Sequence, residues 1–324
     1  MLETVEKNLD GLLEEARLLS WKRFGKKITL YLPGMIRCGS ETGLYPAVSV
    51  SGGECTLSCE HCRGKVLEPM IEATSGENLL AICKRLKTAG NLGVLLTGGS
   101  DSEGRVGWER FAGTIRKIKE ETGLHVSIHT GFLDLKTALL LKEAGVDQAL
   151  TDVIGNSDTL KDVYHLENGT GVIDETLDAL YKAQLPMVPH IVAGLDFGKI
   201  KGEFEAVNML KKYNPPTLVI VTLTPFAGTP MEECKSPDVN DVARLMAYAR
   251  LSLPQTEISL GCEHPRNRMG IELEKSAILA GANRIAVYSD EAIELAGKMG
   301  IEIRYAKTCC SVMSLNVNLH NRKV

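Results

Sequence analysis

The sequence lacks several features that would assign it to a membrane, secreted or nucleic-acid-binding class. No apolar run reaches the roughly 18 residues that a bilayer-spanning helix needs. The segment from Met1 to Glu15 is acidic and amphipathic, unlike a signal peptide. A formal net charge of −4 over 324 residues gives no overall basic field that would attract nucleic acid or a membrane surface. We therefore expect a cytoplasmic protein with neither of these partners.

Low-complexity segments and long proline- or serine-rich linkers are absent too. Hydrophobic residues make up 44% and charged residues 24% of the chain, as in ordinary globular proteins, so a sizeable core can form. The chain contains nine cysteines, an odd number. In a cytoplasmic protein this argues against a disulfide framework and favours metal binding or catalysis.

Apolar segments typical of strands alternate with amphipathic helical segments from Ala47 onward. Predicted strands cover residues 47–51, 93–97, 125–130, 148–153, 187–194, 218–223, 257–261 and 284–288, and a short one follows at 302–305. Predicted helices cover residues 77–89, 108–121, 135–144, 174–183, 201–212, 239–251, 272–280 and 291–299. The continuous apolar run from Leu218 to Val221 is typical of a strand buried on both faces of a parallel sheet.

Eight strand–helix units in succession predict an α/β fold with a parallel sheet. Their even spacing favours a TIM-like (βα) barrel over an open doubly wound sheet, and barrels of this kind use about 250 residues or more. We expect an N-terminal helix and loop over residues 1–46, the barrel over 47–306, and a cysteine-containing tail over 307–324.

The most distinctive segment, SGGECTLSCEHC at residues 51–62, follows the first predicted strand. It places Cys55, Cys59 and Cys62 in a Cys-x3-Cys-x2-Cys pattern. In a (βα) barrel such a loop lies at the C-terminal mouth, where active sites form. Three thiolates on one loop can bind three irons of a [4Fe–4S] cubane and leave the fourth iron open for chemistry. The alternative is a structural zinc site completed by His61 or a distant cysteine, although zinc sites favour paired Cys-x2-Cys units.

This loop resembles the signature of the radical S-adenosylmethionine (SAM) superfamily, and further segments similar to that superfamily follow at predicted strand ends. LTGGS at 96–100 is similar to the Gly-Gly-Glu turn that binds the methionine amino group, with Ser100 replacing glutamate and leaving the binding to backbone carbonyls. HIVAG at 190–194 lies where the superfamily packs adenine, and TPFAGTPM at 224–231 resembles the Gly-Thr-Pro segment of the biotin-synthase-like branch. The resemblance implies SAM contacts at Gly98, Gly99, His61, His190, Gly194, Pro225 and Gly228.

Each of these segments alone has an ordinary structural interpretation. A Gly-Gly at a strand end is usually a turn, a Gly-Thr-Pro is usually a loop and helix cap, and an isolated histidine such as His190 is more often part of the core. Their order after the cysteine loop supports the resemblance.

Six cysteines lie outside the loop. Cys83 falls within a predicted helix and is interpreted as a small core residue, and Cys234 receives no role. Cys38 precedes the first predicted strand, Cys262 ends the seventh, and Cys309 and Cys310 open the tail, so all can reach the same rim. We hypothesise a second Fe–S cluster held by Cys38, Cys262 and Cys309 or Cys310, with Ser311 as a possible oxygen ligand. Unligated thiols scattered on loops are the alternative.

The whole chain is most similar to the two-component lipoyl synthases of anaerobic archaea and bacteria. The matching segments are YPAVSV at 45–50, CRGKVL at 62–67, IHTG at 128–131, DVIG at 152–155, VYHL at 163–166, GC at 261–262, PR at 265–266 and CCS at 309–311. Single-chain lipoyl synthases carry a Cys-x4-Cys-x5-Cys motif ahead of the radical loop, whereas only Cys38 stands there in this chain.

The resemblance implies that a 5′-deoxyadenosyl radical takes hydrogen from an octanoyl chain on a lipoyl carrier protein and that the second cluster donates sulfide. It also implies a sister radical SAM subunit and a ferredoxin- or flavodoxin-type electron donor. Alternatives are biotin-synthase-like sulfur insertion, methylation, rearrangement or cofactor maturation on the same scaffold, an Fe–S protein without catalysis, and a half-active subunit. His129, Arg266 and Arg268 could bind a carboxylate or form salt bridges at the rim.

Overall fold

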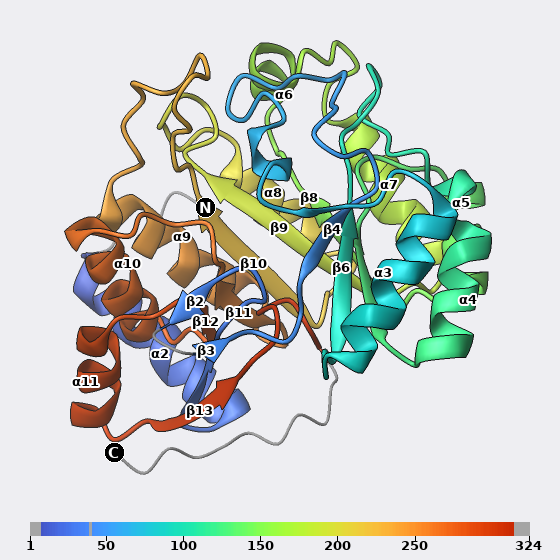
Figure 1. Cartoon of the computed structure of the whole chain (residues 1–324). Coiled ribbons are helices and arrows are strands. Elements are labelled where there is room, and N and C mark those ends of the chain that lie inside the picture. The colour runs from blue at the N-terminus through green and yellow to red at the C-terminus, as the bar shows by residue number, and fades with distance from the viewer. Residues whose placement is uncertain (1–7, 39–40, 314–324) are drawn as a thin grey trace.

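The computed structural model describes residues 8–38 and 41–313, and its centre is one curled sheet in which all paired neighbours are parallel (Figure 1). In spatial order its eleven strands are β13 (Glu302–Ala306), β1 (Lys27–Tyr31), β12 (Arg284–Ala286), β11 (Glu257–Leu260), β10 (Thr217–Thr222), β9 (Met187–Ala193), β8 (Gln148–Asp152), β7 (His125–His129), β6 (Gly93–Thr97), β4 (Ala47–Ser49) and β5 (Ile71–Glu72). A separate hairpin pairs β2 (Arg37–Cys38) with β3 (Glu41–Thr42).

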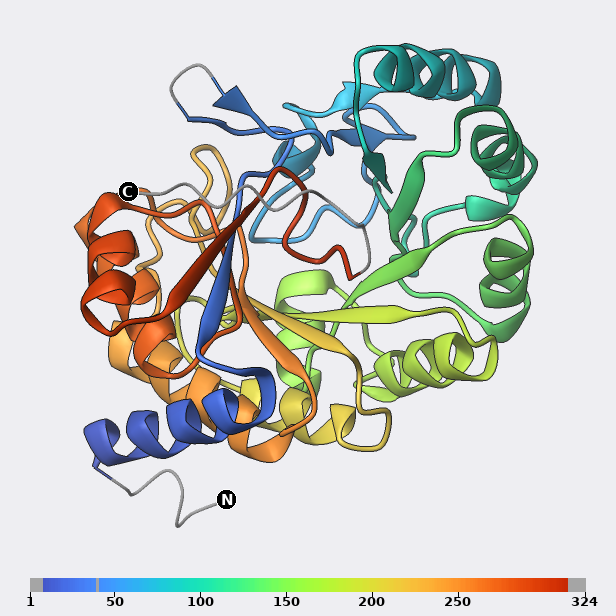
Figure 2. The same ribbon diagram turned by 90° about the horizontal axis from the view of Figure 1, so that it is seen from below.

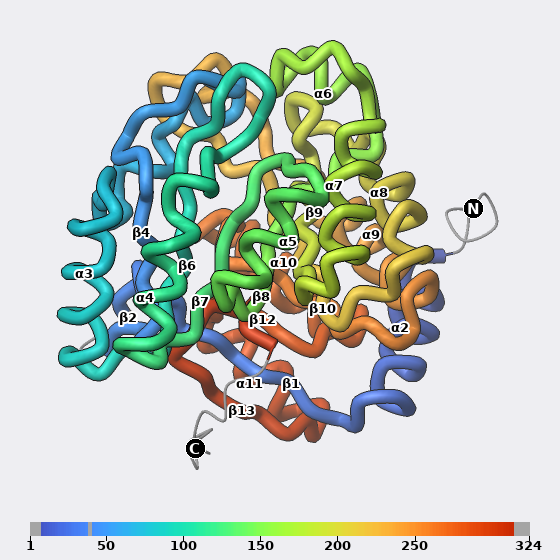
Figure 3. The backbone as a smooth tube through the Cα atoms, turned by 90° about the vertical axis from the view of Figure 1, so that its right-hand side faces the viewer, coloured from blue at the N-terminus to red at the C-terminus, as the bar shows by residue number. Residues whose placement is uncertain are grey.

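Most helices stand on the outer side of the curled sheet, and α6 lies above the strand ends (Figure 3). They are α2 (Leu9–Phe24), α3 (Gly76–Thr88), α4 (Ala112–Thr122), α5 (Leu135–Glu143), α6 (Ser157–Tyr164), α7 (Gly171–Lys182), α8 (Glu203–Leu210), α9 (Val239–Ser252), α10 (Arg268–Leu279) and α11 (Asp290–Lys298), with 3-10 turns η1 (Lys65–Leu67) and η2 (Trp108–Arg110). Side-chain caps begin several of them, for example Ser75 at α3 and Asn267 at α10. None of the helices in the described ranges is long and apolar enough to cross a membrane.

The predicted α/β, TIM-like architecture is confirmed, but the expected closure of the barrel is wrong. Among the described strands, no pairing joins the two edge strands β5 and β13, so the sheet forms a partial barrel. One backbone hydrogen bond between connecting segments spans the gap, from Leu44 N, just before β4, to Lys307 O, just after β13 (2.6 Å). Figure 2 shows the segment after β13 lying within the ring of strands.

The prediction of only helix and loop before Ala47 missed β1. This strand has five residues and follows α2 after a short turn at Gly25, so its Lys-Ile-Thr-Leu-Tyr pattern offers too few residues for a clear alternation. Ile28 and Leu30 are buried, and β1 pairs with β12 on one side and β13 on the other. The eight predicted strands and the short ninth all occur within a few residues of their expected positions.

Because α2 packs against α9 and α10, we expect the N-terminal helix to be part of the core rather than an appendage. Leu12 on α2 is fully buried, whereas Leu18 on the same helix is 54% exposed. Leu12→Ala should lower the free energy of unfolding by about 2–5 kcal/mol, since it leaves a cavity. The matched Leu18→Ala should change it by less than about 0.5 kcal/mol. Denaturant titration followed by circular dichroism measures both, and equal effects would contradict this role of α2.

One buried carboxyl group fixes the end of β9. Glu203, in the first turn of α8, is 5% exposed and accepts a hydrogen bond from the backbone N–H of Gly194 (2.7 Å) through Oε1. Its Oε2 has no hydrogen-bond partner within the described chain. Burial raises the pKa of Glu203 to about 7, although three backbone N–H groups act against this shift.

This raised pKa predicts a pH-dependent stability. Below the ordinary pKa of 4.5 the carboxyl is protonated in both folded and unfolded chains, so its burial adds no ionic cost. As the pH rises towards about 7, this carboxyl ionises first in the unfolded chain. The free energy of unfolding of the wild type therefore falls by up to about 3 kcal/mol relative to that of Glu203→Gln. Unfolding titrations between pH 4.5 and 8 measure this difference. The exposed Glu205→Gln is the control, and a difference that stays constant with pH would contradict the prediction.

Candidate functional site

The cysteine loop begins directly after β4 and rests on the turn that ends β6. Its position depends on Gly99, because a Cβ atom there would lie 1.9 Å from the carbonyl oxygen of Glu54 and 2.6 Å from Cα of Cys55. Gly99 N donates to Ser51 Oγ (2.7 Å), and Ser100 O accepts from the backbone N–H groups of Thr56 and Leu57. The Gly-Gly turn predicted as a SAM contact therefore also supports the loop, and the carbonyl of Ser100 is engaged by that loop.

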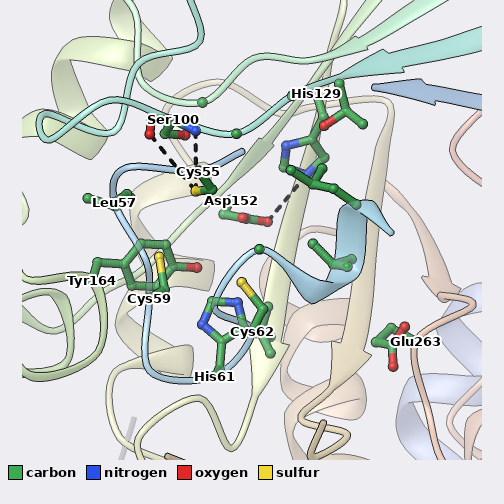
Figure 4. A pocket seen from close by; sticks show the side chains of 18 of the residues that line it. Cys55, Leu57, Cys59, His61, Cys62, Ser100, His129, Asp152, Tyr164 and Glu263 are labelled. Carbon is green, nitrogen blue, oxygen red and sulfur yellow. Dashed lines mark hydrogen bonds and ion pairs between the residues drawn. The ribbon is translucent and has the colours of Figure 1, made fainter. Parts of the chain in front are cut away.

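The three thiols of this loop face a common open space (Figure 4). Cys59 and Cys62 are 5% and 7% exposed, and Cys55 is half-buried with its Sγ accepting from Ser100 N at 3.4 Å. Left-handed backbone at Ser58 and Arg63, with φ of 49° and 46°, turns the chain between and after the cysteines. All three thiols line a pocket of about 270 Å³.

Hydrogen bonding distinguishes Cys59 from Cys62. A hydrogen bond from the Cys59 thiol, with further support from His61, lowers the pKa of Cys62 to about 4. The same hydrogen bond and burial raise the pKa of Cys59. His61 is half-buried with its ring centre 5.5 Å from that of Tyr164 on α6, and its buried Nδ1 has no partner in the described part of the chain. Cys62 therefore favours the thiolate form, which is the form that binds iron.

The arrangement fits an iron–sulfur cluster better than one zinc ion. Within residues 8–38 and 41–313, no three His, Cys, Asp or Glu side chains converge as they would on a single metal ion. A tetrahedral zinc would need its sulfur ligands gathered at about 2.3 Å from one point. A cubane instead takes one thiolate per iron, so its ligands stand apart around a space of their own. Three loop thiols around one gap satisfy this requirement.

The pocket includes only some of the residues predicted to contact SAM. Gly98, Gly99 and His61 line it together with Ser100. From the segment after β10 the described lining contains Leu223, Thr224 and Phe226, and it does not contain Pro225 or Gly228. His190 and Gly194 also lie outside this lining. Their predicted contacts with SAM stay predictions.

Apolar side chains form most of the remaining wall, and they come from several strand ends and from the cysteine loop. They are Leu57, Val66, Leu67, Met70, Leu95, Val106, Phe132, Val192, Val221, Leu223 and Phe226. Such a wall excludes water and offers a long-lived radical few polar partners. The cysteines thus open onto a space suited to radical chemistry.

An ion pair lies in the same pocket, at the ends of β7 and β8. His129 Nε2 is 3.6 Å from Asp152 Oδ1, and the His190 ring is centred 5.7 Å from that of His129. Burial lowers the pKa of His129, but the charge and hydrogen bond of Asp152 outweigh it and raise the pKa overall. Burial and the neighbouring His129 lower the pKa of His190 to about 4. The raised pKa favours the protonated form of His129 beside Asp152, whereas the lowered pKa favours a neutral imidazole at His190.

Sequence reasoning considered His129 but gave Asp152 no role. A sequence feature does indicate a site role for Asp152: it is the only acidic residue of the otherwise uncharged strand β8, and it ends that strand at the barrel mouth. The role predicted for Arg266 also needs revision. Its guanidinium donates to the carbonyls of Cys262 and His264, so it stabilises the loop after β11. Arg268 is the first residue of α10.

Cys262, Cys309 and Cys310 form a second thiol group inside the barrel. Cys310 belongs to a buried apolar cluster with Val219 and Val221 of β10, and Cys262 and Cys309 pack against this cluster. Hydrogen bonds from Cys310 and Ser311 lower the pKa of Cys309 to about 6, and Ser311 Oγ lies 3.0 Å from Cys309 Sγ. The side chain of Cys38 lies outside the described residues, although its backbone belongs to β2.

We expect Asp152 to control the charge of His129. In Asp152→Asn the burial of His129 is no longer opposed by a carboxylate, so the pKa of His129 should fall by about one to three units. Histidine NMR titration of the metal-free protein measures this shift. The surface variant Asp158→Asn, on α6, should leave the pKa of His129 unchanged. If the pKa of His129 is also unchanged in Asp152→Asn, Asp152 does not control the charge of His129.

Comparisons with known proteins agree with this geometry. Residues 207–313 match the Biotin and Thiamin Synthesis associated domain family. The chain is 25% identical over 264 residues to biotin synthase 2 of Paracoccus denitrificans, covering 79% of this chain and 78% of that protein. It is 26% identical to the biotin synthase of Rickettsia felis, with 78% and 82% covered, and 24% identical to that of Acaryochloris marina, with 69% and 65% covered.

Solved structures share the fold. Methylornithine synthase superposes with a TM-score of 0.64 at 19% identity, covering 91% of this chain and 89% of that one. The FeFe-hydrogenase maturase HydG from Carboxydothermus hydrogenoformans superposes with the same TM-score at 16% identity, covering 93% and 73%. The cysteine loop at the mouth of a partial barrel, the matched family and these relatives together identify the chain as a radical SAM enzyme of the biotin-synthase-like branch of its superfamily.

Proposed function

We propose that this enzyme inserts sulfur into unactivated C–H bonds of an octanoyl chain carried on a lipoyl carrier protein, as one subunit of a lipoyl synthase. The observation that supports the proposal most directly is the position of two thiol groups on either side of one apolar layer. Leu95, Val192 and Val221 line the pocket of the cysteine loop and also pack in the cluster that contains Cys262, Cys309 and Cys310. A radical formed at one group and a sulfur source at the other would thus be separated by a single layer of side chains.

In this proposal Cys55, Cys59 and Cys62 hold a [4Fe–4S] cluster and leave one iron open. When bound, the cluster supplies one electron to the sulfonium of SAM, which yields a 5′-deoxyadenosyl radical able to abstract hydrogen. The turn at Gly98 and Gly99 holds the loop against β6 and faces the pocket, where it would meet the methionine end of SAM.

The pocket wall supports an aliphatic substrate. An unactivated carbon has no acidic proton, so acid–base residues cannot start the reaction, and the chain's contribution is to position the substrate and exclude water. Val106, Phe132 and Phe226 provide apolar contact area for this purpose. The His129–Asp152 pair offers the polar contact that would orient a ligand hydroxyl or carbonyl group.

Cys262 and Cys309 or Cys310, together with Cys38, would hold the second Fe–S cluster, from which sulfide would be supplied. The thiolate character of Cys309 and its hydrogen bond from Ser311 support this part of the proposal. The sister radical SAM subunit and the ferredoxin- or flavodoxin-type electron donor belong to the same proposal, and they follow from the sequence resemblance alone.

Biotin-type sulfur insertion is the second candidate, and the names of the relatives favour it. The two candidates share the radical step and differ in the substrate, which is either an acyl chain on a protein or a small sulfur-free biotin precursor.

The cluster assignment predicts a specific loss of iron and of SAM cleavage. In anaerobically reconstituted protein, Cys55→Ala, Cys59→Ala and Cys62→Ala should each lose about four irons per chain, and 5′-deoxyadenosine formation with dithionite should fall at least about 100-fold. Cys234→Ala, which removes a half-buried thiol outside both groups, is the matched control and should keep both properties. Wild-type rates in any loop variant would refute the assignment.

The substrate is decided by mass spectrometry. Octanoylated carrier protein, incubated with the reconstituted enzyme alone and with candidate sister subunits, should gain one or two sulfur atoms. The same reactions with the biotin precursor form the parallel arm. Sulfur in the small product and an unchanged carrier protein would overturn the lipoyl proposal in favour of the biotin type.

A further inference from the structure

The second thiol group depends on a short segment that crosses the interior of the barrel. This segment, residues 308–313, follows β13 and is called the thiol strap here. Figure 2 shows it within the ring of strands, and Cys310 packs in one cluster with Tyr31 of β1, Ala286 of β12 and Leu150 of β8. Thr308, Cys310, Ser311 and Val312 are at most 5% exposed. A segment without helix or strand is thus almost completely buried.

Buried backbone without secondary structure needs hydrogen-bond partners, and two side chains provide them. Arg284 Nη1, at the start of β12, donates to Cys310 O (3.0 Å) and to Val312 O (2.7 Å). Gln148 Nε2, at the start of β8, donates to Ser311 O (3.0 Å), and Gln148 Oε1 accepts from Met313 N (3.1 Å). Three successive carbonyls and one amide of the strap are therefore satisfied by two side chains.

Arg284 itself is held rigidly. Its Nε donates to Glu257 Oε2 at 2.7 Å, its Nη2 contacts the same carboxylate, and its guanidinium carbon lies 5.7 Å from the ring centre of Tyr31. The side chain is 9% exposed. One nitrogen of the planar guanidinium thus donates to the strap and the other two contact the carboxylate of Glu257, an arrangement that lysine cannot reproduce.

Gln148 is 1% exposed and comes from the opposite side of the barrel. Its planar amide offers a donor and an acceptor at one end, as the carbonyl of Ser311 and the N–H of Met313 require. Since β8 and β12 begin at these two residues, both contacts are made at the amino-terminal end of the strands, opposite the cysteine loop.

We infer that Arg284 and Gln148 are positioning residues that seat Cys309 and Cys310 in the barrel interior and so build the second metal site. The inference deepens the proposed function and rests on it for the identity of the bound group. Neither residue would be a ligand. They fix the backbone on both sides of the two cysteines, and Cys310 then lies beside Ser259 of β11 while Cys309 lies beside Ser311.

The test combines iron content with thiol accessibility. Arg284→Lys keeps the charge and loses the fork, and Gln148→Leu removes both strap contacts without adding charge, so the second variant remains informative if the first fails to fold. Arg304→Lys is the matched control, because Arg304 pairs with Glu302 on β13 and makes none of the strap contacts described above. Measured on each protein are iron per chain after anaerobic reconstitution, 5′-deoxyadenosine formation, and the rate at which iodoacetamide alkylates Cys309 and Cys310 in the metal-free form.

We expect Arg284→Lys and Gln148→Leu to hold about four irons where the wild type and Arg304→Lys hold about eight. Alkylation of Cys309 and Cys310 should become at least about tenfold faster, because opening of the strap costs less when its buried partners are lost. Formation of 5′-deoxyadenosine should stay within about threefold of wild type, since the cysteine loop is untouched. Unchanged alkylation in both variants would overturn the inference.

The existence of the second cluster and the positioning role of Arg284 and Gln148 can be rejected independently. Four irons in the wild type would reject the second cluster and leave the strap contacts to be decided by alkylation alone. Eight irons in the wild type and in both variants would reject the positioning role and leave the second cluster intact.

Discussion

The whole site depends on the close backbone contact between Gly99 and the loop that carries Cys55. Only hydrogen fits at the Cα of Gly99, because the carbonyl of Glu54 occupies the position of a Cβ. The register of β4 against β6, with Ser49 opposite Thr97, brings these two strand ends to the same level. Hydrogen bonds to Ser100 then fix the loop, so that sheet register sets the place of all three thiols.

Local patterns in the sequence predicted much of this arrangement. The strands are short continuous apolar runs, and the loops that follow them collect at one end of a parallel sheet, so the cysteine loop, Gly98 and Gly99 were correctly expected at one mouth. The pairing of Cys262 with the tail cysteines followed from the same reasoning. The lipoyl branch, by contrast, was inferred from resemblance and stays a proposal.

Other features depend on contacts between distant residues and could not be read locally. The strand β1 gains its place from β12 and β13, more than 250 residues away in sequence. The four hydrogen bonds that hold the thiol strap join Arg284 and Gln148 to backbone groups, which no side-chain pattern reveals. Barrel closure failed as a prediction because equal spacing of units fixes their order and leaves the pairing of the edge strands undetermined.

The unpaired edges of the sheet have an evolutionary consequence. A closed barrel has a circumference fixed by its strand number and stagger, so its interior can change only by exchanging side chains. Here β5 and β13 are spanned by connecting loops, whose length and sequence vary more easily than those of strands. The width of the interior can therefore change with the connectors at this open edge while the strand ends around the cysteines keep their places.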